Sequence, residues 1–183
     1  MSNQRSLDGK KIAILATNGF EQSELVKPKA MLEQQGAQVE VLSIEGQSKI
    51  TAWDEDNWGV DVDVDAHVED ANPADYDALI LPGGQINPDV LRVNESAVSF
   101  IAKAHKEARI KAIAAICHGP WLLVESALAN NATLTSFPSI KTDLENAGAT
   151  WVDEEVVNDG KLVTSRNPDD IPAFVNKVIE LVA

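Results

Sequence analysis

The sequence predicts an α/β fold in which a mostly parallel sheet lies between two layers of helices. Short apolar segments suited to buried strands recur along the chain, and helical segments separate them. Hydrophobic residues make up 44% of the chain and charged residues 24%, which are ordinary values for a globular protein. A length of 183 residues is enough for one domain with a substantial core. We therefore expect a single three-layer α/β/α domain over residues 1–183, with a polar lead at residues 1–10.

The composition also limits the compartment and the partners. The net charge of −14 disfavours binding to nucleic acid and to anionic membrane surfaces. No apolar run is long enough to span a membrane, and the first residues lack the apolar core of a signal peptide. The single cysteine excludes an intramolecular disulfide and suits a reducing compartment. We expect a cytoplasmic protein with no nucleic-acid or membrane partner.

The first half of the chain resembles a β-α-β unit followed by an acidic segment. Residues 11–17 predict a buried strand, and residues 25–33 predict a helix with Pro28 in its first turn. A second strand follows at 38–43. Residues 60–68 alternate between apolar and acidic side chains, which predicts a half-exposed strand or a hairpin. The acidic face of this segment is more typical of a solvated surface than of a cation site.

The second half of the chain continues the alternation of strands and helices. In order, we expect a buried strand at 78–81, helical segments at 89–93 and 96–108, a buried strand at 111–116, a helix at 121–127, a short strand at 133–136, a helix at 140–147, a hairpin over 156–164 with an Asp-Gly turn, and a closing helix at 169–182.

Cys117 lies at the predicted turn between a buried strand and a helix. Ala115, Cys117 and Gly119 have the spacing of a nucleophile elbow, in which small residues let the turn close and present the central side chain above the sheet. The N–H groups at the start of the helix would lower the pKa of the thiol and favour a thiolate. A buried structural cysteine is the alternative. The His118-Gly119-Pro120 sequence that follows favours the reactive interpretation.

A second turn could assist a nucleophilic sulfur. The strand at 78–81 ends in Pro82-Gly83-Gly84, at the edge where open α/β sheets place their ligands. Paired glycines let backbone N–H groups approach a reacting oxygen, so Gly83 and Gly84 are candidates for an oxyanion hole. Pro-Gly-Gly by itself is most often only a turn, and its weight here comes from the neighbouring elbow.

The general base is less evident. The chain has three histidines, His67, His105 and His118, and none lies after residue 118. His118 adjoins the cysteine, but neighbouring residues on a tight turn point in different directions, so a conventional intrachain triad is not predicted. A protonated Glu24 with a pKa raised by burial could donate a hydrogen bond to the thiolate or transfer protons, and Glu21 is the competing candidate. An acidic residue at a helix start can equally be a cap or a dipole partner.

A set of motifs occurs together in this chain. They are Gly19-Phe20-Glu21-x-x-Glu24-Leu-x-x-Pro28, Ala78-Leu-Ile-Leu-Pro82-Gly83-Gly84, Ala115-Ile-Cys117-His118-Gly119-Pro120 and Asp153-Glu-Glu-Val-Val-x-Asp-Gly160. Together they resemble the ThiJ/PfpI superfamily, and they are most similar to its PfpI-type members, known as intracellular proteases and general stress proteins. The resemblance implies a flavodoxin-like fold related to class I glutamine amidotransferases, and a homodimer or higher homo-oligomer.

The resemblance also implies roles for individual residues. Cys117 matches the reactive elbow cysteine, and Glu24 matches the carboxylate that contacts it. Gly84 matches the oxyanion-hole glycine, with the N–H of His118 as the second donor. In PfpI-type proteins this histidine pairs with an acidic residue of the neighbouring subunit, and Asp89 is the residue that would supply it here.

The activity that the resemblance implies is a cysteine-dependent reaction in stress protection. Family members have been assigned peptidase, glyoxalase III-type and deglycase activities, all of which begin with attack of a thiolate on an electrophilic carbonyl. The expected substrate is a small carbonyl compound or adduct, or a peptide, and no metal or other cofactor is expected. The alternative is a non-catalytic redox sensor or holdase in which Cys117 is oxidised. Residues 53–58 (WDEDNW) resemble a loop of one stress-protein branch, and no role follows for them.

Overall fold

A seven-stranded sheet forms the centre of the computed structural model, which describes residues 7–183, and its strand order is β11-β12-β8-β7-β1-β3-β6. Adjacent strands run parallel except for β11 and β12, which form the predicted hairpin. The strands are β1 (Lys11–Leu15), β3 (Gln38–Ser43), β6 (Ala66–His67), β7 (Ala78–Leu81), β8 (Ala112–Ile116), β11 (Val157–Asp159) and β12 (Leu162–Ser165). The prediction of a mostly parallel sheet is confirmed.

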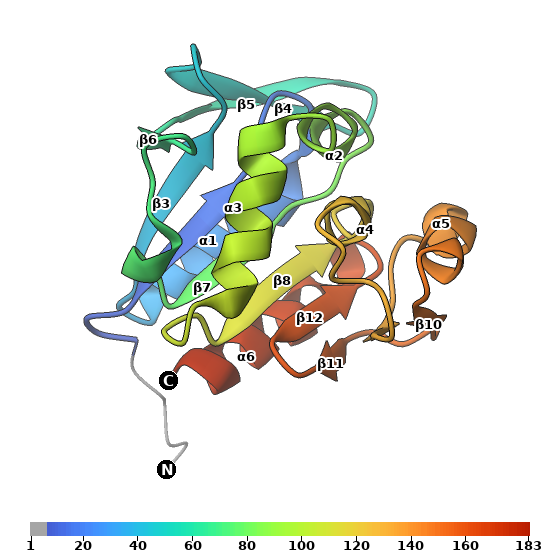
Figure 1. The fold of residues 1–183 in the computed structure, drawn as a ribbon. Helices are drawn as coiled ribbons and strands as arrows, with labels where there is room; N and C mark the ends of the chain where they lie inside the picture. The colour runs from blue at the N-terminus through green and yellow to red at the C-terminus, as the bar shows by residue number, and fades with distance from the viewer. Residues whose placement is uncertain (1–6) are drawn as a thin grey trace.

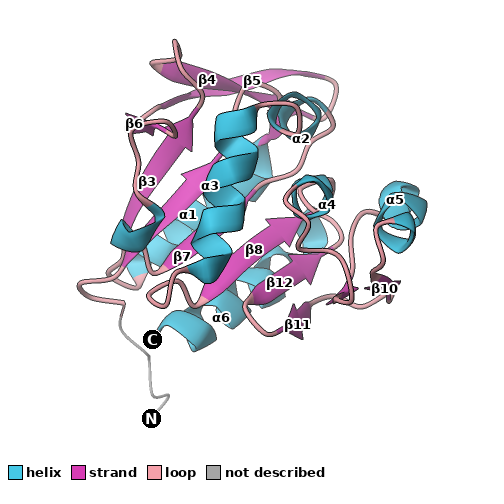
Figure 2. Ribbon diagram, viewed as in Figure 1, coloured by secondary structure: helices cyan, strands magenta, loops and turns pink. Residues whose placement is uncertain are grey.

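Helices cover both faces of this sheet (Figures 1 and 2). One face packs against α1 and α6, and the other packs against α3 and α4. The helices are α1 (Gln22–Gln34), α2 (Ile86–Leu91), α3 (Glu95–Lys106), α4 (Trp121–Glu125), α5 (Lys141–Asn146) and α6 (Ile171–Val182). Successive residues of β1 alternate between the two cores, since Ile12 and Ile14 face α1 and α6 while Ala13 and Leu15 face α3. The three-layer architecture is therefore confirmed.

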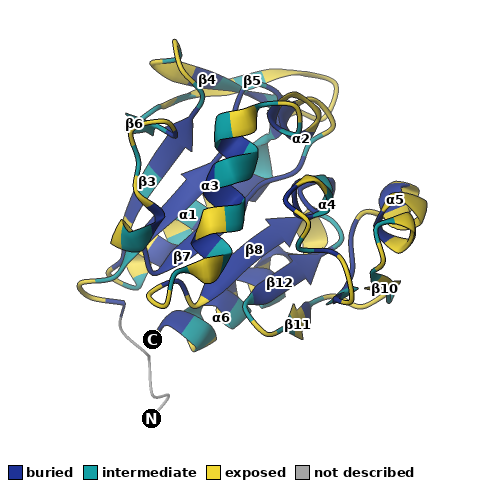
Figure 3. Ribbon diagram, in the orientation of Figure 1, coloured by how far each residue is buried: buried dark blue, intermediate teal, exposed yellow. Residues whose placement is uncertain are grey.

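Two small sheets lie outside the central one. The first has the order β2-β4-β5, with β2 (Phe20–Glu21), β4 (Lys49–Asp54) and β5 (Asn57–Asp63), and the second pairs β9 (Thr133–Leu134) with β10 (Thr150–Trp151). The alternating segment at 60–68 thus supplies the end of a β4–β5 hairpin and the edge strand β6. Much of β5 is exposed, in contrast to the buried strands of the central sheet (Figure 3).

Some predictions about the elements were wrong in detail. Helix α1 begins at Gln22, so Pro28 lies inside the helix and not in its first turn. Helix α2 begins at Ile86, because the chain turns into a helix directly after the Pro-Gly-Gly turn. Within the predicted polar lead Leu7 is completely buried, and residues 1–6 lie outside the described part of the chain.

The parallel strands β1, β7, β8 and β12 direct their carboxyl ends to the same edge of the sheet (Figure 1). The loops that follow these strands therefore meet there, as open α/β sheets require. None of the helices formed by residues 7–183 has the length and apolar character needed to cross a membrane.

Candidate active site

Cys117 occupies a strained turn directly after β8. Its φ angle is +62°, a left-handed conformation that a non-glycine residue adopts only when the surrounding structure enforces it. Its N–H donates to the carbonyl of Ser165 at 3.0 Å, and its carbonyl accepts from the N–H of Phe137 at 2.8 Å. A side chain at Gly119 would collide with the carbonyl of Leu81. The predicted elbow is therefore present, and β12 and the segment before η2 (Pro138–Ile140) hold it in place.

The side chain of His118 lies beside the sulfur. Its Nδ1 atom is 3.2 Å from Sγ of Cys117, and only 4% of the residue is exposed. The imidazole stacks on Phe137 with ring centroids 4.9 Å apart, and it meets Trp121 in a T-shaped arrangement with centroids 5.1 Å apart. Burial lowers the pKa of His118, so the ring is neutral at pH 7 and can accept a proton. The expectation that the tight turn would separate these side chains is wrong.

Glu24 is the carboxyl group of the site. It is completely buried, and its Oε2 atom accepts a hydrogen bond from the N–H of Gly83 at 2.7 Å. Burial raises the pKa of Glu24 to about 8; the bond from Gly83 opposes this shift and the charge of Glu21 adds to it. Glu24 therefore carries a proton at neutral pH. Because Oε2 is engaged as an acceptor, Oε1 is the oxygen that can hold this proton, and a side-chain hydrogen bond links the carboxyl group to Cys117.

Gly83 allows the carboxyl group and the sulfur to lie side by side. A Cβ atom at this position would be 2.5 Å from Oε2 of Glu24 and 2.7 Å from Cβ of Cys117. The N–H of Gly83 is committed to Glu24, so the prediction that Gly83 supplies an oxyanion-hole donor is wrong. Its position instead requires a residue without a side chain.

The backbone N–H groups of Gly84 and His118 point at the sulfur of Cys117. These are the two donors that the family resemblance implies for an oxyanion hole. Gly84 has φ of +79°, and a Cβ there would be 2.5 Å from the carbonyl oxygen of Gly19. Glycine at this position therefore lets the N–H turn toward the sulfur.

The thiol itself is not activated in the way expected from the turn. Burial raises the pKa of Cys117, and a negative charge on Glu24 would raise it further, whereas the N–H groups of Gly84 and His118 act in the opposite direction. Cys117 is 8% exposed, so desolvation of the thiolate outweighs the two backbone donors. The resting sulfur is therefore a thiol, and His118 is the neighbouring group that can remove its proton.

A pocket of about 440 Å³ opens above these groups. Its lining residues come from β2, α1, α2 and β4, from the loops that follow β1, β4, β7 and β8, and from two later segments. They are Gly19, Glu21, Glu24, Trp53, Glu55, Gly84, Gln85, Ile86, Cys117, His118, Phe137 and Pro168. Two of them, Glu21 and Glu55, add carboxylates to the wall, and no lysine or arginine is among them. The segment 53–58 lies at the pocket, because Trp53 is one of the lining residues. Trp53 packs edge-on against Trp58 with ring centroids 5.3 Å apart.

Two residues at the site escaped the sequence analysis. Asn87 is completely buried, and its side chain accepts from the N–H of Thr17 at 2.7 Å and donates to the carbonyls of Pro82 and Gly83 at 3.0 and 3.2 Å. It ties the Pro-Gly-Gly turn to the end of β1. Ser139 places its Oγ atom 3.3 Å from Nε2 of His118. An isolated asparagine or serine carries no sequence signal that would distinguish it from a turn residue.

The remaining candidates lie away from the sulfur or have other partners. Glu21 lines the pocket and accepts from the Ser23 hydroxyl at 3.2 Å, and Glu24 is the carboxyl group that acts on the thiol. Asp89 is exposed on α2 and does not line the pocket, so its pairing with His118 of another subunit stays a prediction. His67 contacts the carbonyl of Gln47 at 3.1 Å. Within residues 7–183, no cluster of His, Cys, Asp and Glu has an arrangement suited to a metal ion.

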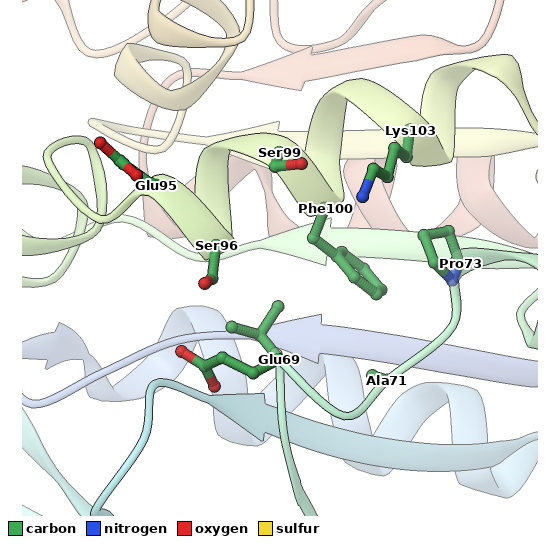
Figure 4. Close-up of a pocket in the computed structure, with 9 residues that line it drawn as sticks. Glu69, Ala71, Pro73, Glu95, Ser96, Ser99, Phe100 and Lys103 are labelled. Carbon is green, nitrogen blue, oxygen red and sulfur yellow. The ribbon is translucent and has the colours of Figure 1, made fainter.

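A second cavity of about 320 Å³ lies between α3 and the segment that leads into β7 (Figure 4). Phe100 and Pro73 form its apolar part, and Glu69, Ser96 and Lys103 are among its polar residues. It contains neither a cysteine nor a histidine. Cys117 and His118 line the pocket at the carboxyl edge instead.

The sequence model of the DJ-1/PfpI family matches residues 10–181. The chain belongs to the DJ-1/PfpI family. Among its relatives, deglycase PfpI of Pyrococcus furiosus is 38% identical over 172 residues, which cover 94% of this chain and 99% of the relative. General stress protein 18 of Bacillus subtilis is 41% identical over 175 residues, covering 95% and 98% of the two chains.

The fold agrees with this assignment. The crystal structure of Drosophila melanogaster DJ-1beta superposes with a TM-score of 0.83 at 27% identity, covering 94% of this chain and 90% of that chain. The resemblance to the ThiJ/PfpI superfamily and the flavodoxin-like α/β fold are thus confirmed.

Proposed function

We propose that this DJ-1/PfpI family member is a cysteine enzyme acting on small carbonyl compounds or their early adducts, with Cys117 as nucleophile. The observation that carries the proposal is the sulfur of Cys117 at 3.2 Å from Nδ1 of a neutral His118, next to a protonated Glu24. Nucleophile, base and acid then lie in one pocket. The relatives named deglycase and general stress protein support a role in protection against reactive carbonyls.

The first step follows from the geometry. His118 accepts the thiol proton at Nδ1 as the sulfur bonds to a carbonyl carbon. The C=O π bond breaks, and the oxygen takes up its electron pair. The N–H groups of Gly84 and His118, which point at the sulfur, lie where they can donate to this oxygen. The proton held by His118 then passes to the oxygen, which leaves a neutral hemithioacetal.

With an α-oxoaldehyde the reaction can proceed without an external oxidant. The hydrogen on the sulfur-bearing carbon leaves as a proton while the ketone oxygen takes one up, which gives an enediol. A proton then returns to the former ketone carbon as the hydroxyl on the sulfur-bearing carbon loses its own proton. The first carbon thereby reaches the oxidation level of a thioester, and the ketone becomes an alcohol. Water then cleaves the thioester, which releases a 2-hydroxy acid and restores the thiol. The neutral His118 is the group beside the sulfur that can accept a proton, and the protonated Glu24 is the group that can supply one.

The pocket favours small substrates that carry no negative charge. Cys117 is 8% exposed and lines a cavity of about 440 Å³, which excludes the backbone of a folded protein. Glu21 and Glu55 lie in its wall without an accompanying cation among the lining residues, so an anionic carbonyl compound is repelled. We therefore favour a small neutral aldehyde or adduct over a peptide.

Redox sensing is the competing function. A sensor cysteine is usually an exposed thiolate of low pKa. Burial raises the pKa of Cys117, and its side chain is recessed. A buried thiol can still act as a nucleophile, because His118 removes its proton as the substrate binds. For this reason we favour catalysis over redox sensing.

The decisive measurement is turnover of methylglyoxal, a small neutral α-oxoaldehyde. We expect lactate formation by the wild-type protein and a loss of at least about 10³-fold in Cys117→Ser. Ser99→Ala on α3, remote from the pocket, serves as the matched control and should retain the wild-type rate. Equal rates for the wild type and Cys117→Ser would refute the proposal.

A further inference from the structure

Two peptide groups of the turn after β7 supply the N–H groups that face the reactive side chains. The N–H of Gly83 donates to Oε2 of Glu24 at 2.7 Å, and the N–H of Gly84 points at the sulfur of Cys117. Each N–H belongs to a planar peptide group whose carbonyl points the opposite way. The direction of the Gly83 N–H is therefore tied to the Pro82 carbonyl, and that of the Gly84 N–H to the Gly83 carbonyl.

The sequence of this turn does little to fix those directions. A peptide group between two residues rotates through the ψ angle of the first residue and the φ angle of the second. Gly83 and Gly84 have no side chains to restrict these rotations, and Gly84 lies at φ of +79°. Contacts from elsewhere in the chain must therefore hold the two carbonyls.

The side chain of Asn87 makes those contacts. Its Nδ2 atom donates to the carbonyls of Pro82 at 3.0 Å and Gly83 at 3.2 Å. Its Oδ1 atom accepts from the N–H of Thr17 at 2.7 Å, which anchors the side chain to the segment after β1. The N–H of Glu21 in β2 adds a second donor to the Gly83 carbonyl, at 3.3 Å. The turn is thus held against the chain that follows β1.

The chemistry of these partners leaves one orientation of the Asn87 amide. Thr17 offers an N–H, which can only donate, and the two carbonyls can only accept. The amide oxygen must therefore face Thr17, and the amide nitrogen must face the turn. Asn87 is completely buried, so rotation of its side chain would leave buried polar groups without partners.

We propose that Asn87 is a positioning residue, whose amide fixes the two peptide groups of the turn so that their N–H groups face Glu24 and Cys117. The inference deepens the proposed function, and only its consequence for turnover depends on that function. The N–H of Gly84 is one of the two donors available to the oxygen of a bound carbonyl group, so Asn87 also orients part of the oxyanion hole. Asn87 acts through the backbone and does not line the pocket itself.

A role of Asn87 in stability alone would have a different consequence from a role in orientation. Cys117 is the single cysteine of the chain, so alkylation by iodoacetamide reports on one thiol. Unfolding exposes the buried sulfur and speeds its alkylation, whereas loss of the Gly84 N–H removes a donor from the thiolate and slows it. The sign of the change in rate therefore separates the two roles.

The direct test is the rate at which iodoacetamide alkylates Cys117 at pH 7.5. We expect Asn87→Ala to react about tenfold more slowly than the wild type, because the thiolate loses one hydrogen bond. Asn94→Ala is the matched control, since Asn94 caps α3 by accepting from the N–H of Ala97 at 2.9 Å and does not line the pocket. The control should lose stability and react at the wild-type rate or faster. A wild-type or faster rate in Asn87→Ala would overturn the proposal.

Asn87→Asp provides a second test, which keeps the shape of the side chain and serves even where Asn87→Ala fails to fold. An ionised carboxylate still accepts from Thr17 but repels the two carbonyls, whereas a protonated carboxyl group can donate to one of them. The alkylation rate of Asn87→Asp relative to the wild type should therefore be near one at pH 5.5 and about tenfold lower at pH 8.5. Glu21, Glu24 and His118 titrate near the turn in both proteins, so the ratio isolates residue 87. A ratio that does not change with pH would overturn the proposal.

The orientation of the Gly83 N–H is tested by the pH dependence of stability. The bond from Gly83 lowers the pKa of Glu24, so its loss in Asn87→Ala should move that pKa above its value of about 8. Stability falls as the pH rises between the unfolded and folded pKa values, so the pH at which it levels off should move upward. Urea unfolding over a series of pH values measures this shift, with Asn87→Ala/Glu24→Gln as the reference. Levelling at the same or a lower pH would contradict the proposal.

Turnover of methylglyoxal gives the consequence for the proposed function. Loss of one oxyanion donor should lower kcat of Asn87→Ala about 10²-fold with little change in KM. A wild-type kcat in this variant would overturn the inference and leave the proposed function in place. Alkylation and unfolding do not require turnover, so an inactive wild-type protein with the expected alkylation rates would refute only the proposed function.

Discussion

A buried carboxyl group lies at each end of β7, Asp77 before the strand and Glu24 of α1 beside the turn that follows it, and the surroundings of the two are opposite. At the amino end, Asp77 accepts from the N–H of Lys11 at 2.8 Å and from the Arg109 guanidinium at 3.0 Å. Burial works to raise the pKa of Asp77, but these bonds hold it below its usual range. At the carboxyl end, Glu24 has one backbone donor, from Gly83, and burial raises its pKa to about 8.

The difference shows which end of the sheet is arranged for stability and which for chemistry. Asp77 is paired with a cation and joins β1, β7 and the loop before β8, so its charge favours folding. Glu24 is buried without a cation partner among the described residues, beside the sulfur of Cys117. A buried acid with a raised pKa destabilises the fold at neutral pH, and such groups concentrate at active sites.

The largest effect is expected from Glu24→Gln on turnover. Glutamine keeps the acceptor for the Gly83 N–H but cannot transfer a proton, so kcat/KM for methylglyoxal should fall by about 10²-fold. Steady-state kinetics at pH 7 measure this change. Asp77→Asn, corrected for the folded fraction, should keep the wild-type rate. A wild-type rate in Glu24→Gln would show that the two carboxyl groups do not differ in role.

The same substitution should stabilise the protein at alkaline pH. With a folded pKa of about 8 against an ordinary value of 4.5, folded Glu24 binds a proton that the unfolded chain lacks between these values. Stability therefore falls as the pH rises through this window and then levels off. Glu24→Gln should exceed the wild type by at most about 5 kcal/mol at pH 8.5. The two should converge below pH 4. Urea unfolding across this pH range measures the difference in stability between the two proteins. A difference that does not change with pH would contradict the prediction.

Asp77→Asn should show the opposite dependence on pH. Because the pKa of Asp77 is lowered, its contribution is present above the unfolded pKa and is lost as the pH falls through the folded pKa. We expect a loss of about 1–3 kcal/mol at pH 7 in urea unfolding, since Arg109 loses its partner. The difference from the wild type should shrink in acid. A constant difference down to pH 2 would show that the charge of Asp77 is not what matters.

The smallest effect is expected from Glu21→Gln. The charge of Glu21 helps to raise the pKa of Glu24, so its removal should lower that pKa by less than about one unit. The alkaline end of the stability window should move to lower pH by the same amount. Urea unfolding over a series of pH values measures this shift, with Glu24→Gln and the double variant Glu21→Gln/Glu24→Gln as references. An upward shift would mean that the two groups interact in another way.

The arrangement of the elements and the elbow could be predicted because both depend on short stretches of sequence. A short apolar run such as residues 111–116 is typical of a parallel strand that is buried on both faces. The small residues Ala115 and Gly119 on either side of Cys117 permit the tight turn that follows. The position of Pro28 was mispredicted because propensity places proline in a first turn, whereas packing of α1 against the sheet retains it inside the helix.

The details of the site depend on loops that meet only in the folded chain. Gly83 was predicted as an oxyanion donor, but Glu24, distant in sequence, takes its N–H. Ser139 and Asn87 act on residues that lie far from them or across a turn, and no local pattern marks them. The spacing of neighbouring residues carries no information about contacts between segments that are distant in the sequence.

The sequence by itself determined the fold class and singled out Cys117 as the proposed nucleophile, because strand periodicity and a glycine-flanked turn are properties of a few consecutive residues. Only the tertiary structure decided the charge on that nucleophile and its neighbours. The pKa values of Cys117 and Glu24 are set by how much water the packed loops exclude and by which N–H groups face each atom. Those quantities exist only once distant parts of the chain have come together.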